Sequence, residues 1–252
     1  MADMYFLSKN YVSASDTINV SSGASYKSRI YDQRYDFQWI SSGETAEAGY
    51  NTYIEIIFYE QSAVINRTYD TIVLQGINLK KFKLQNYTGG SYADIAGSEY
   101  IVNADASVRI KLAAPVTGSK IKLLMQSTIA AGEEKKVGEL WVCLQNYQLS
   151  NPKSARSQQN QTEMGFYRFA NGAGAQWFIY DKWQKTYKID YLTNTQIDSL
   201  YAIFNSHATI TFYEDYARDI NLIKLVAWVG SFMRDDNPKT KLNTLTMALR
   251  EV

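Results

Sequence analysis

The sequence predicts a mainly β chain folded as two domains, the second of which carries a single packed helix. Three observations support this fold class. The 252 residues exceed what one domain of about 150 residues holds. The 20 tyrosines, 10 phenylalanines and 5 tryptophans, against only 3 prolines, favour the pleated surface of a sheet, where aromatic side chains pack well. Helical periodicity is clear in one segment only, which leaves the other apolar segments as strands.

The first domain is expected at residues 1–145, as an antiparallel β-sandwich. Its clearest strand is 80–87, in which Phe82 and Leu84 alternate with polar residues. The adjacent glycines within 88–91 provide the turn of a hairpin, because glycine adopts positive φ readily. Further strands are predicted at 52–58, 71–74, 92–95, 108–112, 120–124 and 139–144. No helical period lies between them, which is typical of a sandwich.

The second domain is expected at residues 146–252. Its first part, 146–161, is polar and contains few apolar residues, so we interpret it as either a linker or an exposed hairpin arm. Aromatic segments follow. Strands are predicted at 164–169, 176–180, 186–191, 209–213, 220–228 and 242–251.

The one helix is predicted at about 193–205. Thr193 and Gln196 have the spacing of a capping box, in which both side chains satisfy free backbone groups of the first turn. Apolar residues then recur at i, i+3, i+4 and i+7, at Ile197, Leu200, Tyr201 and Phe204. A single apolar stripe of this kind predicts a helix that lies on a sheet.

Charge and composition exclude several function classes. Lysine and arginine number 26 against 25 acidic residues, whereas a nucleic-acid coat or a polybasic membrane binder needs a surplus of cations. The single cysteine, Cys143, excludes an intrachain disulfide and a cysteine-rich zinc site. The single histidine, His207, excludes a multi-histidine metal site. No apolar stretch reaches the roughly 18 to 20 residues of a membrane span.

Candidate chemistry is sparse, and we expect a protein that is not an enzyme and holds no cofactor or metal. His207 follows the helix, where it is predicted to be a capping or surface residue. Glu214, Asp215 and Asp219 lack the regular spacing of a calcium loop. A glycoside hydrolase needs two carboxylates at a set separation in space, which a sequence does not define. A depolymerase therefore remains a third alternative.

The order of segments in the first domain is distinctive. YIEI at 53–56 is followed by TIVLQGINL at 71–79, GGSYADI at 89–95, PV at 115–116, KIKLL at 120–124 and GELWV at 138–142. This order resembles the discoidin-like, or coagulation-factor type C, jelly roll over about residues 5–145. The resemblance implies an early strand at Ile30-Tyr31-Asp32 and a core tryptophan at Trp39. Phe58-Tyr59-Glu60 replaces the family's usual "dlg", and the terminal cysteine pair of extracellular members is missing.

The second domain shows a pattern of its own. An aromatic strand, WFIY at 177–180, precedes the helical segment 192–204 and the strand ITFYED at 210–215. This pattern resembles the tail-tube-like domains of phage tails over about residues 138–252. The resemblance implies a β-sandwich or split barrel with one packed helix, as in distal tail and minor tail proteins.

The predicted ligand-binding residues are Tyr26, Arg34, Tyr35 and Tyr50, which lie in the loops between the early strands. In the discoidin-like family these are the binding loops, and they vary too much for any ligand residue to be carried over. Aromatic side chains there could stack on sugar rings. Packing between subunits is an equally good interpretation.

Two functional hypotheses follow. The first is a structural component of a bacteriophage tail, at the tail tip, distal tail or baseplate hub. It would assemble as a symmetric ring of its own copies and contact tube, hub or fibre proteins. Residues 1–5 lack a basic region followed by an apolar core, so we expect synthesis in the host cytoplasm and residence in the virion. The alternative is a carbohydrate-binding module, a lectin-like adhesin that acts on host cell-surface glycans.

Overall fold

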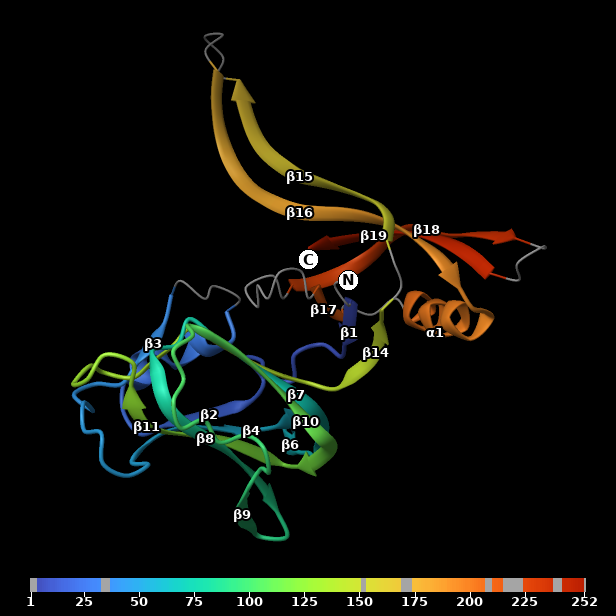
Figure 1. The fold of residues 1–252 in the computed structure, drawn as a ribbon. Helices are drawn as coiled ribbons and strands as arrows, with labels where there is room; N and C mark the ends of the chain where they lie inside the picture. Colours follow the sequence, from blue (N-terminus) through green and yellow to red (C-terminus); the bar gives the residue numbers. More distant parts are fainter. Residues whose placement is uncertain are drawn as a thin grey trace. The chain divides into compact units, whose positions relative to one another are not determined.

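The computed structural model describes residues 4–32, 37–150, 153–168, 174–206, 210–214, 224–237 and 242–251. They divide into two compact units, and Figure 1 labels strands of both units and the α-helix. The first unit holds residues 7–146, and the second combines residues 4–6 with the described residues from 147 onward. The described residues are mainly β with one packed α-helix, which confirms the predicted fold class.

The first unit is a β-sandwich. One sheet has five strands, in the order β2 (Thr17–Val20), β4 (Thr52–Ile57), β11 (Lys120–Thr128), β8 (Leu79–Thr88) and β9 (Ser91–Asp94). The other has three, in the order β10 (Ser107–Gly118), β7 (Arg67–Gln75) and β13 (Glu139–Cys143). Ile54 of β4, Leu123 of β11 and Leu74 of β7 lie in one buried core. Because successive side chains of a strand point to opposite faces, one face of each sheet contributes to this core.

Short elements close the sandwich. They are β3 (Trp39–Ile40) paired with β12 (Lys136–Val137), β5 (Tyr59–Glu60) paired with β6 (Ala63–Val64), and the 3-10 helix η1 (Ala24–Ile30). Trp39 is fully buried, as the resemblance implies. The early strand expected at Ile30-Tyr31-Asp32 is wrong, because Ile30 is the buried last residue of η1.

The second unit contains one sheet. Its order is β14 (Gln145–Leu149), β1 (Met4–Leu7), β17 (Ile210–Glu214), β18 (Lys224–Asn237), β19 (Leu242–Glu251), β16 (Gly174–Leu192) and β15 (Lys153–Arg168). The core of this unit includes Leu245, Met247 and Leu249 of β19, the alternating residues of the predicted last strand. Ile197 and Leu200 of the helix α1 (Asn194–Asn205) belong to the same core, so α1 packs on the sheet.

The N-terminal strand belongs to the second unit, whereas the sequence predicted it in a first domain of residues 1–145. β1 lies between β14 and β17 in the sheet of the second unit. All four of its residues are buried, and Met4 and Phe6 are fully inaccessible in the second core. A strand pairs wherever its apolar side chains are buried, so its place in the sequence does not decide which unit it joins.

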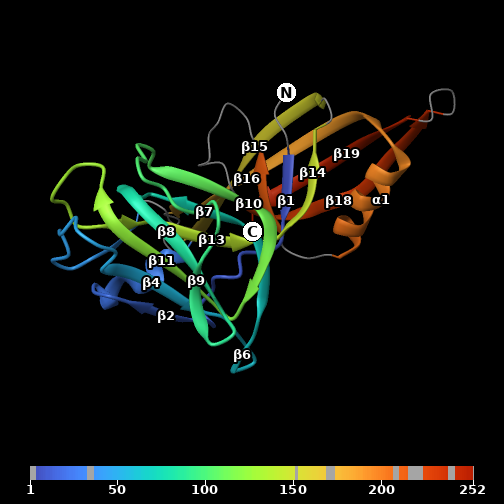
Figure 2. The same cartoon turned by 60° about the horizontal axis from the view of Figure 1, so that its bottom comes forward.

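Helix α1 begins as predicted. Thr193 is its N-cap, and both hydrogen bonds of the capping box with Gln196 are present. The predicted stripe is only partly buried: Ile197 and Leu200 are inaccessible, but Tyr201 is 48% exposed. Its ring lies 5.1 Å from that of Phe232 on β18. Figure 2 shows α1 beside the strands β18 and β19. Within the described residues, no helix is long and apolar enough to cross a membrane.

The described residues of the polar stretch 146–161 lie mostly in strands, and those from Lys153 onward form one arm of a hairpin. The stretch enters β14 and then β15, which pairs with β16 from Lys153 opposite Ile189 to Arg168 opposite Gly174. The strands predicted separately at 176–180 and 186–191 are both parts of β16. In Figure 1 β15 and β16 run on together beyond β19 as an arm.

Candidate functional site

Two exposed aromatic side chains and one half-buried arginine lie at η1, and we call Tyr26, Arg29 and Phe37 the Tyr26 platform. The Arg29 guanidinium carbon lies 4.4 Å from the centre of the Tyr26 ring and 5.9 Å from that of Phe37. Tyr26 is 43% exposed and Phe37 is 40% exposed. One guanidinium hydrogen bond, from Nη1 to the Gln38 carbonyl oxygen at 3.2 Å, fixes the Arg29 side chain. The platform thus presents two accessible rings with a cation near both of them.

The backbone before η1 explains how the platform is placed. Gly23 has φ +65°, a left-handed conformation that glycine adopts without strain. A Cβ at this position would lie 2.1 Å from the Ile40 carbonyl oxygen, so a larger residue does not fit. The Tyr26 amide donates to the Gly23 carbonyl oxygen at 3.1 Å. Side chains three residues apart eclipse one another in a 3-10 helix, which places Arg29 over Tyr26.

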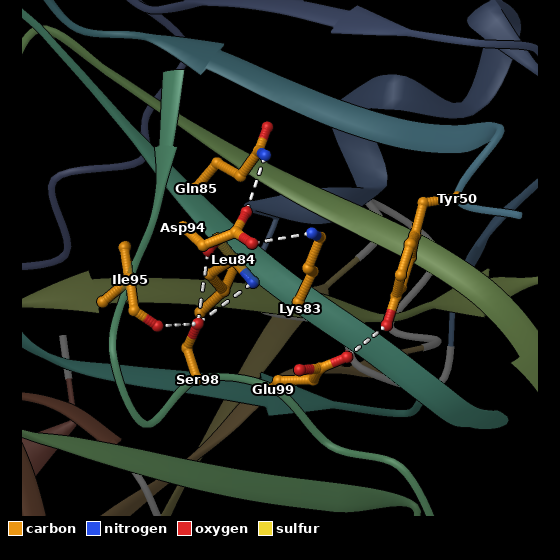
Figure 3. Close-up of polar contacts among 8 residues, drawn as sticks. All are labelled: Tyr50, Lys83, Leu84, Gln85, Asp94, Ile95, Ser98 and Glu99. Carbon is orange, nitrogen blue, oxygen red and sulfur yellow. Dashed lines mark hydrogen bonds and ion pairs between the residues drawn. The ribbon is translucent and has the colours of Figure 1, made fainter.

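Tyr50 belongs to a different group, the Tyr50 cluster, made of Tyr50, Lys83, Gln85, Asp94 and Glu99 (Figure 3). The Tyr50 hydroxyl donates to Glu99 Oε1 at 2.8 Å, and Lys83 Nζ lies 4.9 Å from the centre of its ring. Asp94 accepts from both Lys83 Nζ at 2.8 Å and Gln85 Nε2 at 2.7 Å. The polar groups of this cluster therefore bind one another.

Two pKa values show the effect of these contacts. Burial, and then the Glu99 and Asp94 carboxylates, raise the pKa of Tyr50 to about 12. Hydrogen bonds from Lys83 and Gln85 hold the pKa of Asp94 below its usual value. At neutral pH Tyr50 is a protonated donor and Asp94 is an ionised acceptor, so neither group is poised to exchange a proton.

A row of polar side chains crosses the outer face of the five-stranded sheet of the first unit. Strand register aligns Asn19, Glu55, Lys122, Gln85 and Asp94 on β2, β4, β11, β8 and β9. Glu55 accepts hydrogen bonds from Tyr92 and, at 2.7 Å, from Asn19, and Lys122 Nζ lies 3.4 Å from it.

These partners set the charge of the row. Burial acts to raise the pKa of Glu55, but hydrogen bonds from Tyr92 and Asn19, together with the Lys122 ammonium, lower it below its usual value. The Glu55 carboxylate is therefore ionised at neutral pH and already occupied by three donors. Glu55 is therefore not suited to act as a general acid, and its contacts tie neighbouring strands of the sheet together.

Two of the four predicted ligand-binding residues can be placed. Tyr26 lies on η1 and Tyr50 precedes β4, in separate groups of side chains. Arg34 and Tyr35 lie outside the described residues, as do His207, Asp215 and Asp219. Sequence reasoning did not find Arg29 or Phe37. The spacing of Tyr26 and Arg29 was the available signal, but it points to a contact only once a 3-10 helix is assigned there.

Among the described residues, no group of three or more histidine, cysteine, aspartate or glutamate residues could hold a metal ion. Cys143 is a buried cysteine on β13. Of the two groups of side chains described above, the Tyr26 platform has the more exposed aromatic rings, which makes it the candidate for contact with a ligand.

Comparison with known proteins gives structural neighbours but no sequence match. No family model and no curated protein sequence matches the chain. Similar solved structures include the family 32 carbohydrate-binding module of Clostridium perfringens NanJ in complex with galactose. That pair has 14% identity and a TM-score of 0.43, covering 56% of this chain and 98% of the module.

Two further modules give similar values. One, from a family 31 glycoside hydrolase of Clostridium perfringens, has 13% identity and a TM-score of 0.41, covering 53% of this chain and 96% of the module. The other is a chitosan-binding module from a Paenibacillus chitosanase/glucanase in complex with chitotriose. It has 14% identity and a TM-score of 0.41, covering 51% of this chain and 95% of the module.

Proposed function

We propose that the first unit is a carbohydrate-binding module that holds a sugar on the Tyr26 platform. The observation that carries the proposal is the exposure of two aromatic rings close to one guanidinium, which is itself fixed by a backbone carbonyl. The apolar face of a sugar ring packs against an aromatic ring. Its hydroxyl groups accept hydrogen bonds from a nearby donor.

The chemistry of Arg29 suits this task. A guanidinium carries five N–H donors in a fixed plane, and one hydrogen bond to Gln38 leaves others for sugar hydroxyls. The platform is an open surface without deep burial, so binding by a single sugar is expected to be weak. A Kd near 1 mM, about −4 kcal/mol, is of the order that such a contact provides.

Tyr50 has a smaller part in this proposal. Its hydroxyl is used by Glu99, and its side chain is less exposed than that of Tyr26. What it can offer a sugar is therefore limited to part of the ring. Binding free energy is expected to be concentrated at Tyr26 and Arg29.

Substitution of Tyr26 tests the proposal. We expect Tyr26→Ala to weaken sugar binding by the full-length chain about tenfold or more, roughly 1.4 kcal/mol, because the stacking surface is lost. Galactose and chitotriose are suitable first probes, and isothermal titration calorimetry gives the Kd. Tyr191→Ala is a matched control, since Tyr191 is a more exposed tyrosine at the end of β16. Equal affinities for all three proteins would contradict the assignment of the site.

A second candidate function, as a subunit of a phage-tail ring, is favoured by the β15–β16 arm. Within the described residues, β16 pairs with β19 only over Gln184–Leu192, whereas its pairing with β15 continues to Gly174. The outer part of the hairpin is thus a two-stranded ribbon, and such ribbons are marginally stable alone. Contact with another subunit would stabilise it.

Shortening the arm tests this candidate. In the full-length chain, we expect an oligomer by sedimentation velocity at micromolar concentration. Replacing 161–182 with an Asn-Gly turn should give a monomer, because the two-residue turn keeps the hairpin closed but removes the ribbon. A full-length chain that is already monomeric at tens of micromolar would count against the ring.

A further inference from the structure

Lys135 is a buried lysine whose ammonium is bound by backbone. The residue is 1% exposed. Its Nζ donates to the carbonyl oxygens of Glu44 at 2.7 Å and Ala46 at 2.6 Å. Its own amide donates to Ser41 Oγ at 2.9 Å, which fixes its position beside β3. A buried ammonium is costly unless it is hydrogen-bonded, so these contacts define its geometry strongly.

The contacted loop has no regular structure of its own. Residues 41–51 lie between β3 and β4, and most of them are exposed. Burial lowers the pKa of Lys135, while the Glu44 and Glu47 carboxylates act to raise it. The ammonium therefore lies between two carbonyl oxygens and within reach of two negative charges. It holds this loop as an internal cation would.

The same loop is tied to the turn that starts η1. The Ser42 amide donates to Ser22 Oγ at 3.0 Å, and Ser21 Oγ donates to Glu44 Oε2 at 2.8 Å. Gly23 follows this turn and accepts the hydrogen bond of the Tyr26 amide. A continuous set of contacts therefore connects the Lys135 ammonium to the Tyr26 platform.

We propose that Lys135 is a positioning residue for the sugar site: its ammonium fixes the 44–46 loop, and through Ser21 and Ser22 it fixes the turn on which Tyr26 and Arg29 are mounted. The proposal rests on the function proposed above for the platform. It assigns Lys135 no contact with the sugar itself.

Amide hydrogen exchange of the full-length chain tests this without any sugar. In Lys135→Met, whose unbranched side chain is similar in length, we expect the Ser42 and Tyr26 amides to exchange about tenfold faster. Lys136→Met, one residue further along on β12, is the matched control and should leave both amides unchanged. Unchanged exchange in Lys135→Met would overturn the proposal.

Chemical rescue separates positioning from a general loss of stability. In Lys135→Ala, ethylammonium should restore protection of the two amides, whereas tetramethylammonium, which cannot donate a hydrogen bond, should not. Equal effects of the two salts, or no restoration by ethylammonium, would overturn the proposal even if Lys135→Met unfolds the unit.

Sugar affinity provides the functional measurement. If the unsubstituted chain binds sugar, Lys135→Met should bind about tenfold more weakly than Lys136→Met, and equal affinities would contradict the positioning role. If the unsubstituted chain binds no sugar, the proposed function fails, while the exchange measurements still decide whether Lys135 holds the loop.

Discussion

Leu200→Asp is expected to unfold the second unit. Leu200 is fully buried between α1 and the sheet, in a core shared with Leu245 and Met247. Loss of a buried leucine costs about 2 to 5 kcal/mol, and an unpaired buried carboxylate adds to this cost. A domain of this size has a total stability of only about 5 to 15 kcal/mol.

The comparison variant is Tyr201→Asp, on the next residue of the same helix. Tyr201 is 48% exposed, so a carboxylate there stays hydrated and should have a much smaller effect. Thermal and urea unfolding followed by circular dichroism would measure the difference, with the first unit expected to keep its β signal. Equal stability of the two variants would mean that the helix does not pack through Leu200.

Asp70→Ala is expected to destabilise the first unit strongly. The buried carboxylate of Asp70 accepts from Thr71 Oγ1 at 2.8 Å, from the Gln145 amide at 2.9 Å and from Lys111 Nζ. It thereby links β7 to β10 and to Gln145 of the same unit. Removing it leaves three donors without this acceptor. The free energy of unfolding should fall by roughly 2 to 4 kcal/mol, since Lys111 is partly exposed and can be hydrated again.

Asp94→Ala provides the contrast. Asp94 also pairs with a lysine, Lys83 at 2.8 Å, but its side chain is 56% exposed. Exposed ion pairs contribute about 0 to 1 kcal/mol, so this variant should unfold within 1 kcal/mol of the unsubstituted chain. Urea unfolding followed by tryptophan fluorescence compares the two. If the free energy of unfolding fell equally in both variants, the buried contacts of Asp70 would contribute no more to stability than an exposed ion pair.

Local sequence patterns predicted the elements whose environment is simple. β8 alternates cleanly because one face is buried and the other is polar, and β19 has the predicted bounds for the same reason. The capping box marked the start of α1 correctly, since a cap depends only on residues within one turn. These features are decided by neighbours in the sequence.

Features decided by distant contacts were not predictable in this way. β1 joins the second unit because its apolar residues are buried beside β14 and β17, which follow more than 100 residues later. The length of β16 was missed because its polar middle interrupts the apolar pattern. The paired strand β15 nevertheless continues the ladder there.

The candidate site shows the same limit. Tyr26 and Tyr50 could be selected as aromatic residues in early loops. Arg29 becomes a candidate only through the 3-10 geometry of η1, and Lys135 only through carbonyl groups about 90 residues earlier in the chain. Neither contact leaves a periodic signal in the sequence.

A glycan array probed with the full-length chain tests whether the first unit binds sugar. We expect saturable binding of at least one neutral mono- or oligosaccharide, with a Kd at or below about 1 mM on subsequent titration. That binding should be lost when Tyr26 is replaced by alanine. Absence of binding to every sugar at millimolar concentration would contradict the claim that the first unit is a carbohydrate-binding module.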